Sequence, residues 1–187
     1  DAYYAAFKVP DFVYNLLIVG ALSTGFIPIF TSLYNRENPT KAWRLSSAIL
    51  NLAGCILAIT SLVGSLSAPL IAHIIAPGFD HETLKLTISF TRIIFLSPLL
   101  LGISMVLGGI LQSLRHFVTY SFAPILYNVG IIIGSTVLYP LIGPTGIAWG
   151  VVLGAALHTA VQWYGAHTAG FRWSPIFSIR DTMVRTI

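Results

Sequence analysis

The chain has 187 residues, of which 56% are hydrophobic and only 9% are charged. Soluble domains carry roughly 25% charged residues, so this composition argues against a soluble enzyme, a disordered chain, a coiled coil and a nucleic-acid-binding module. The single cysteine, Cys55, excludes a disulfide framework and a cysteine-based zinc site. The histidines show no metal-ligand spacing, so no metal and no cofactor is expected. The remaining class is an all-α integral membrane protein.

Stretches without Asp, Glu, Lys or Arg predict five transmembrane helices. A spanning helix needs about 20 mostly apolar residues, and the uncharged stretches cover residues 12–35, 45–79, 93–114 and 116–171. The last is too long for one helix and contains a turn signal at Gly143-Pro144-Thr145-Gly146. The expected spans are about 11–34, 46–74, 87–113, 119–141 and 146–168.

Basic residues predict the orientation, because cytoplasmic loops carry an excess of Lys and Arg. Most of them fall on one side, in the 35–44 loop, the 114–118 turn and the 171–187 tail. We therefore expect that side to be cytoplasmic. The tail, with Arg180, Asp181 and Arg185, is interpreted as an interfacial segment that leads to a further helix. Both ends are expected to be cuts within a longer, transporter-like protein; a natural five-span protein is the alternative.

Polar residues in the first helix share one face. Asp1, Lys8, Asp11 and Asn15 are spaced seven, three and four residues apart, which places them on one side of a helix. If the helix continues through Pro10, this stripe should face a water-filled cavity. In the alternative, Pro10 starts the helix and Lys8 is an ordinary loop residue.

Arg92 is the other charge at a predicted span. Charged residues in a membrane are costly and mark functional sites, so a cavity or ion-pair role is one hypothesis. The alternative is that its long side chain reaches the outer interface.

Small residues recur at helical spacing in the last two spans. Gly146, Gly150 and Gly154 follow one another every four residues, and Gly130 and Gly134 do so one span earlier. Glycine at this interval lets another helix approach closely, so these residues are predicted to pack helices together. His158, four residues after Gly154, is interpreted either as an interhelical hydrogen-bonding residue or as a proton-linked one.

Several segments resemble one membrane protein family in order and spacing. They are Asp1-Ala2-Tyr3-Tyr4-Ala5-Ala6-Phe7-Lys8-Val9-Pro10, Gly20-Ala21-Leu22-Ser23, Phe26-Ile27-Pro28, Ala76-Pro77-Gly78-Phe79-Asp80, Thr91-Arg92-Ile93, Ala123-Pro124 with Asn128, Ala148-Trp149-Gly150-Val151 and Ala169-Gly170-Phe171. They resemble the MurJ/MviN lipid II flippases of the MOP exporter superfamily, and the resemblance covers essentially the whole chain.

The resemblance implies a fold of about fourteen helices in two lobes around a cationic cavity, of which this chain would be helices two to six. It implies a multi-pass flippase of the bacterial cytoplasmic membrane, not an enzyme, whose partners are a lipid-linked cell-wall precursor and membrane lipid. The sequence departs from the family at Tyr14 and Asn15, where paired arginines are typical, and at Val19 and Thr24.

These departures leave Lys8 as the only cation on its face and make Asp1, Lys8, Asp11, Asn15 and Arg92 the candidate substrate-binding residues. The alternatives are another MOP-type exporter, of polysaccharide repeat units or drugs, and a degenerate, non-transporting scaffold for cell-wall enzymes.

Overall fold

The computed structural model describes residues 1–16 and 20–176, and these residues form helices and no strand. In chain order the helices are α1 (Ala2–Tyr14), α2 (Gly20–Ser32), α3 (Pro39–Leu66), α4 (Ala68–Ile75), α5 (His81–Ile94), α6 (Leu96–Ser113), α7 (Phe117–Ile133), α8 (Tyr139–Ile142) and α9 (Thr145–Thr168). The π-helical turns Leu33–Glu37 and Gly134–Leu138 extend α2 and join α7 to α8, respectively.

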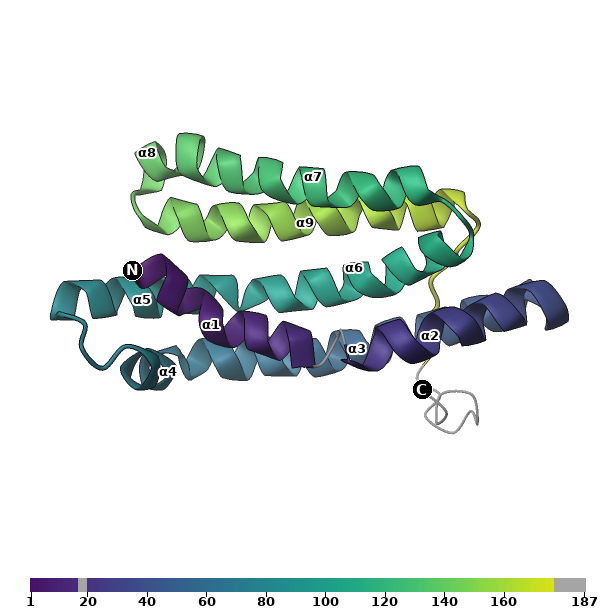
Figure 1. Ribbon diagram of the computed structural model, residues 1–187, viewed down its shortest axis with the longest axis horizontal. Helices are drawn as coiled ribbons and strands as arrows, with labels where there is room; N and C mark the ends of the chain where they lie inside the picture. Colours follow the sequence, from purple (N-terminus) through teal and green to yellow (C-terminus); the bar gives the residue numbers. More distant parts are fainter. Residues whose placement is uncertain (17–19, 177–187) are drawn as a thin grey trace.

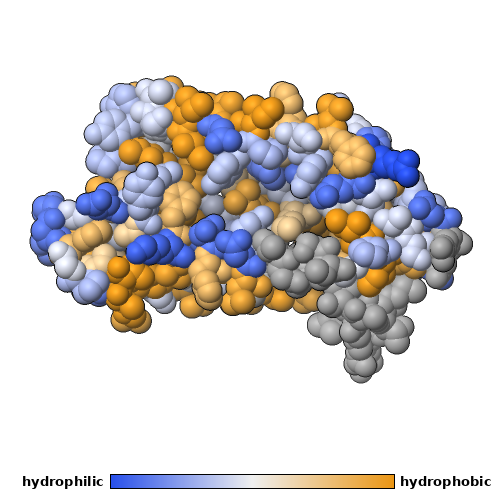
Figure 2. All heavy atoms as spheres, viewed as in Figure 1, coloured by the Kyte–Doolittle hydropathy of each residue, from blue (hydrophilic) through white to orange (hydrophobic). Residues whose placement is uncertain are grey.

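The helices lie nearly parallel or antiparallel in a flattened bundle (Figure 1). The pair α7 and α9 forms one edge, α6 follows next to α9, and α1, α2 and α3 form the opposite side. Figure 2 shows apolar side chains along the edge formed by α7, while hydrophilic residues gather along α1 on the face toward the viewer. An apolar edge beside a polar face is typical of a helix bundle that meets lipid on one side and water on another.

Four helical stretches of the described residues are long and apolar enough to cross a membrane. They are Pro39–Leu66, His81–Ser113, Phe117–Ile142 and Thr145–Thr168. The sequence predicted five spans, so the number found in the described part of the chain is corrected to four. The remaining predicted span, 11–34, contains residues 17–19, which lie outside the described residues.

The bounds of the helices differ from those of the predicted spans for a physical reason. Helix α3 begins at Pro39, ahead of the predicted 46, because the Asn38 side chain accepts a hydrogen bond from the Thr40 amide and Pro39 suits the first turn. The predicted span 46–74 is interrupted at Ser67, after which α4 begins at Ala68 with Pro69 in its first turn. Hydropathy predicts the section that spans lipid, whereas capping residues set where a helix begins.

Two other expectations about chain breaks have clear outcomes. The predicted turn at residues 143–146 is confirmed, because α8 ends at Ile142, Gly143 has φ of 73° and α9 begins at Thr145. The alternative in which Pro10 starts the first helix is wrong, because α1 begins at Ala2 and runs through Pro10.

Two clusters of buried side chains hold the bundle together. The larger joins α2, α3 and α6 to the end of α9, with Phe26, Phe30, Leu57, Leu107 and Phe171 fully enclosed. The smaller packs α1 against α5 and α9 through Ala2, Ala6, Phe90, Ile94 and Ala148. Because lipid is as apolar as these side chains, close van der Waals packing stabilises such contacts in a membrane.

Candidate functional site

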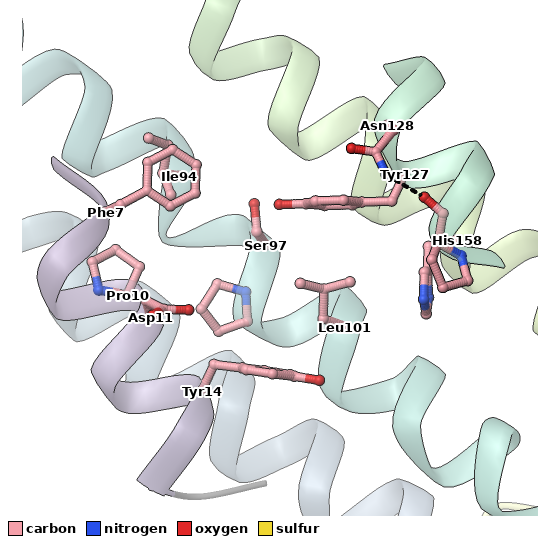
Figure 3. Close-up of a pocket in the computed structure, with 12 residues that line it drawn as sticks. Phe7, Pro10, Asp11, Tyr14, Ile94, Ser97, Leu101, Tyr127, Asn128 and His158 are labelled. Atoms are coloured by element: carbon pink, nitrogen blue, oxygen red, sulfur yellow. Dashed lines mark hydrogen bonds between the residues drawn. The ribbon is translucent and has the colours of Figure 1, made fainter. Parts of the chain in front are cut away.

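A pocket of about 290 Å³ with a mainly apolar lining opens between α1, α6, α7 and α9 (Figure 3). Its polar lining residues are Asp11, Tyr14, Ser97, Tyr127, Asn128 and His158. Its apolar lining residues are Phe7, Pro10, Ile94, Pro98, Leu101 and Pro124. Ser97 lies near the middle of the continuous stretch His81–Ser113, and His158 near the middle of α9. The pocket therefore lies about halfway along the helices that can span a membrane.

Helix α1 brings its side chains to this pocket because it continues past Pro10. Phe7, Pro10, Asp11 and Tyr14 recur at intervals of three and four residues and all line the pocket. Such residues share one face of a helix. Asp11 is the only acidic residue among the lining residues, and no lysine or arginine lines the pocket.

Of the five candidate substrate-binding residues, only Asp11 lines this pocket. Asp1, Lys8, Asn15 and Asp11 itself are exposed, with Asp1 just before α1 and Asn15 just after it. The Asn15 side-chain amide donates to the Asp11 carbonyl oxygen at 2.9 Å. Arg92 is exposed in the last turn of α5, where its carbonyl oxygen accepts a hydrogen bond from Ser65 Oγ at 3.3 Å. The structure does not bring the five residues together at one point.

His158 joins two helices. Its Nδ1 lies 2.7 Å from Ser104 Oγ on α6, which confirms the interpretation of an interhelical hydrogen bond. The Tyr127 ring meets the His158 ring edge-on, with centroids 6.4 Å apart. Nearby, Thr159 Oγ1 donates to the Leu100 carbonyl oxygen of α6 at 2.8 Å. These contacts hold the wall of the pocket formed by α6 and α9.

The glycines of the last two spans lie where α7 and its extension meet α9. A Cβ atom added to Gly150 would lie 2.5 Å from Gly134 Cα and 3.0 Å from the Gly130 carbonyl oxygen. A Cβ atom on Gly130 would overlap Gly154, one on Gly154 would overlap the Tyr127 carbonyl oxygen, and one on Gly146 would overlap the backbone of Leu138. The two backbones are thus closer than any side chain would allow.

After α9 the chain runs back along α3. The buried Asn51 side chain of α3 donates to the carbonyl oxygens of Ser174 and Ile176 at 2.9 and 3.0 Å, and accepts from Trp173 Nε1 at 2.7 Å. Residues 171–176 are not helical. The predicted interfacial segment around Arg180, Asp181 and Arg185 lies outside the described residues.

Sequence reasoning did not single out Ser97 and Tyr127 as pocket residues. Ser97 lies in the apolar run Ile94 to Leu101, and its Oγ is buried without a hydrogen-bond partner. Tyr127 was indistinguishable in sequence from an aromatic residue that faces lipid. A signal existed for Ser97, because a hydroxyl next to Pro98 in the middle of a span needs a partner.

The geometry defines the class of protein: a polytopic α-helical membrane protein with a mid-span pocket that contains several polar side chains, which is typical of transporters. Comparison with known proteins then identifies the family. The family model described as lipid II flippase MurJ matches residues 1–187, so this chain belongs to the MurJ family, whose members are transporters and not enzymes.

Individual relatives agree with this assignment. The lipid II flippase MurJ of Burkholderia cenocepacia is 29% identical over 166 residues, which are 87% of this chain and 32% of the relative. The probable lipid II flippase MurJ of Treponema pallidum is 31% identical over 198 aligned positions, covering 100% of this chain and 37% of the relative. That of Rhizobium tropici is 29% identical, covering 91% of this chain and 33% of the relative. The chain thus spans about a third of the length of these relatives.

Proposed function

We propose that the protein moves lipid II, an undecaprenyl-pyrophosphate-linked saccharide, across the bacterial cytoplasmic membrane by alternating access. This chain would supply helices two to six, most of the first of two lobes. The match of the family model to residues 1–187 is the observation that carries the proposal. The mid-span pocket and the four helices long enough to cross a membrane are consistent with it.

The substrate carries a pyrophosphate, which needs cationic partners, and Lys8 is the candidate on α1. Its side chain is exposed and forms no salt bridge with a residue in 1–16 or 20–176, so its ammonium group can meet a phosphate. Lys8 lies one helical turn from Asp11, at the margin of the pocket and outside its lining. We place the headgroup near Lys8, and its further polar contacts would be Asp11, which lines the pocket, and the exposed residues Asp1, Asn15 and Arg92.

The proposal is tested by the variant Lys8→Ala in the full-length protein, expressed in cells depleted of their own flippase. A charged hydrogen bond to phosphate is worth about 1.5–3 kcal/mol, so growth should fail although the protein is made and inserted. Lys8→Arg, which keeps the charge, should restore part of the growth. Lys85→Ala is the matched control, because Lys85 is an exposed lysine whose only described ion pair is with Glu82 at 3.7 Å. Normal growth with Lys8→Ala would remove Lys8 from the substrate site.

A second candidate function is a non-transporting scaffold that recruits cell-wall synthesis enzymes. The observation that favours it is the pair Tyr14 and Asn15 at the places of the family's usual arginines; Tyr14 lines the pocket and brings no positive charge. In that case the full-length wild type would not support growth of the depleted cells, but would co-purify with such enzymes. If the wild type supports growth of the depleted cells, the protein is a transporter and not a scaffold. If the protein instead exports polysaccharide units or drugs, the wild type would not support growth of the depleted cells and would not co-purify with cell-wall synthesis enzymes.

A further inference from the structure

A groove of about 520 Å³ lies between α3, α6, α9 and the segment that follows α9. It is lined by Leu50, Asn51, Gly54, Cys55, Ala58, Ile103, Trp163 and Trp173. Gly54 faces open space, because nothing lies within 4 Å of a Cβ atom added to it, and Cys55, Ala58 and both tryptophans are exposed. The groove is therefore open to the surroundings of the bundle along α3, and it shares no lining residue with the pocket beside α1.

The surface beside this groove is suited to lipid. Helix α3 is long and apolar enough to cross a membrane, and the large apolar side chains of Ile56, Ile59 and Leu62 are exposed on it. Ile56 and Ile59 directly follow the groove residues Cys55 and Ala58 in the chain, and Leu62 lies one turn beyond Ala58. Because an exposed apolar surface on a spanning helix meets hydrocarbon, the groove is bordered by lipid rather than by water.

The polar atoms inside the groove are already engaged by the protein. Asn51 is the lining residue with a side-chain amide, and its nitrogen donates to the carbonyl oxygens of Ser174 and Ile176. Its oxygen accepts from Trp173 Nε1 at 2.7 Å, which also satisfies the indole donor. An occupant of the groove thus meets apolar carbon and aromatic faces and gains its binding free energy from dispersion and shape. These properties fit a hydrocarbon chain.

Basic side chains lie at the end of the groove where α3 begins. Arg44 precedes Asn51 by seven residues, so it lies on the groove's face of α3. Its exposed side chain has no hydrogen bond or salt bridge with another described residue. Arg172, directly before Trp173, is also exposed, and only its Nη1 is used, in hydrogen bonds to two backbone carbonyl oxygens at 2.8 and 3.0 Å. Basic groups beside a gap between spanning helices bind anionic lipid headgroups.

The length of the site matches one leaflet of a bilayer. Arg44 and Ala58 are 14 residues apart, which is about 21 Å along a helix. Half of a bilayer, headgroup region included, is about 20–22 Å thick. A lipid whose phosphate lies at Arg44 therefore places its chain beside Cys55 and Ala58, at the depth of the groove.

We propose that this groove binds one chain of an anionic phospholipid from the leaflet in which α3 begins, with the lipid phosphate at Arg44 and Arg172. The arginines select a lipid of net negative charge over a zwitterionic one, whose own ammonium group already compensates its phosphate. The bound chain fills the space between α3 and Trp163 of α9, next to the segment that Asn51 holds, so the lipid stabilises the exit of α9 against α3. The site does not depend on movement of lipid II.

The test is photo-crosslinking of the purified full-length protein, in neutral detergent and without lipid II, to phosphatidylglycerol with a diazirine in its acyl chain. Adducts should map to residues 50–58, Trp163 and Trp173, and unlabelled phosphatidylglycerol should displace the probe better than phosphatidylcholine does. Arg44→Gln should raise the half-saturating probe concentration about fivefold, the loss expected for one basic residue near a membrane surface. Gly54→Leu, which fills the groove, should raise it roughly fivefold or more.

Two control variants match these changes. Arg115→Gln removes an exposed arginine outside the groove, and Gly78→Leu adds the same side chain at another glycine with nothing within 4 Å of an added Cβ atom; both should bind the probe as the wild type does. Adducts absent from the groove residues would show that another part of the full-length protein covers them, and would overturn the proposal. So would equal displacement by phosphatidylcholine, or displacement by undecaprenyl phosphate alone. If Gly54→Leu does not fold, the Arg44→Gln result decides.

Discussion

At the scale of single residues, Asp80 shows how a helix end is set outside the apolar core. Its Oδ1 accepts hydrogen bonds from the amides of Glu82 and Thr83 at 3.0 and 3.1 Å, and Thr83 Oγ1 donates to its Oδ2 at 2.6 Å. These bonds, that of the Thr83 hydroxyl first, lower the pKa of the Asp80 carboxyl below its ordinary value. The residue satisfies amides that a helix start otherwise leaves unpaired.

Replacing Asp80 by alanine should therefore lower the thermal midpoint of the full-length protein, because the first turn of α5 loses its cap. Asp80→Asn, which caps nearly as well, should keep most of the stability and serves as the control. Equal midpoints for Asp80→Ala and wild type at neutral pH would show that the cap does not stabilise α5.

The same residue predicts a dependence on pH. Since the folded-state pKa is lowered, the stabilisation by the charged form is present above the unfolded-state pKa of about 4 and is lost as the pH falls through the folded-state value. The stability difference between wild type and Asp80→Asn should accordingly shrink on acidification below about pH 4. Thermal melts of both proteins between neutral and acidic pH measure it.

At the scale of elements, the contact between α7 and α9 depends on the absence of side chains. The glycines of both helices face each other with their backbones in direct contact, and Gly134 and Gly150 are mutual nearest neighbours. Because apolar side chains gain little by leaving lipid for a protein interior, this approach is stabilised by dispersion and by complementary shape. A single methyl group inserted there cannot be accommodated by moving a side chain.

Gly150→Ala should destabilise the protein by about 1–3 kcal/mol through overpacking, although alanine favours a helix more than glycine does. Gly54→Ala is the matched control, because Gly54 lies in α3 and nothing lies within 4 Å of a Cβ atom added to it. The control should be neutral or gain up to about 1 kcal/mol from helix propensity. Thermal midpoints and folded yield compare the two, and Gly150→Leu should be worse still. Equal stability of Gly150→Ala and Gly54→Ala would contradict the close approach of the helices.

At the scale of the whole molecule, Asn51 ties the segment after α9 to the middle of α3, more than 120 positions earlier in the chain. One side chain satisfies two carbonyl oxygens and the Trp173 indole, and Ser47 Oγ accepts from the Ser174 amide at 3.3 Å. The link holds the exit of α9 against α3, so it restricts how these two helices can move relative to each other.

Asn51→Ala should cost about 1–3 kcal/mol, because the buried groups it serves are left unpaired. Thr60→Val in the same helix is the control, since Thr60 Oγ1 bonds only the Ile56 carbonyl oxygen of its own helix. Thermal unfolding measures the loss, and cleavage by protease within residues 171–176 should accelerate in Asn51→Ala alone. If cleavage is unchanged, the segment is held by other contacts.

The orientation predicted from the basic residues belongs to this scale as well. In a protein with Cys55→Ser, a cysteine at Thr40 should react with a membrane-impermeant thiol reagent only from the cytoplasm, and one at Glu82 only from outside. Both side chains are exposed: Thr40 lies in the first turn of α3, and Glu82 lies in the first turn of α5, which follows the opposite end of α3 in the chain. Removal of Cys55 is necessary because this cysteine is exposed on α3. Labelling of position 40 from outside would reverse the topology.

The amino-acid sequence by itself determined the class of protein and the family, because a scarcity of charges and long apolar stretches leave only helices in lipid as a stable solution. It also located the turn at Gly143 and the polar face of α1, which follow from local backbone chemistry and helical spacing. Hydropathy did not predict where the helices begin, because the starts of α3 and α5 depend on the capping side chains of Asn38 and Asp80.

Only the tertiary structure decided which polar residues meet. Asp11, Ser97, Tyr127 and Asn128 come from three helices that are distant in sequence, and no spacing rule connects them. Lys8 and Arg92 were as prominent in the sequence as Asp11, yet they do not line the pocket, because rotation by one residue moves a side chain about 100° around a helix. The packing of α1 against α5 and α6 sets that rotation, and it depends on residues far apart in the chain, so local sequence patterns do not predict it.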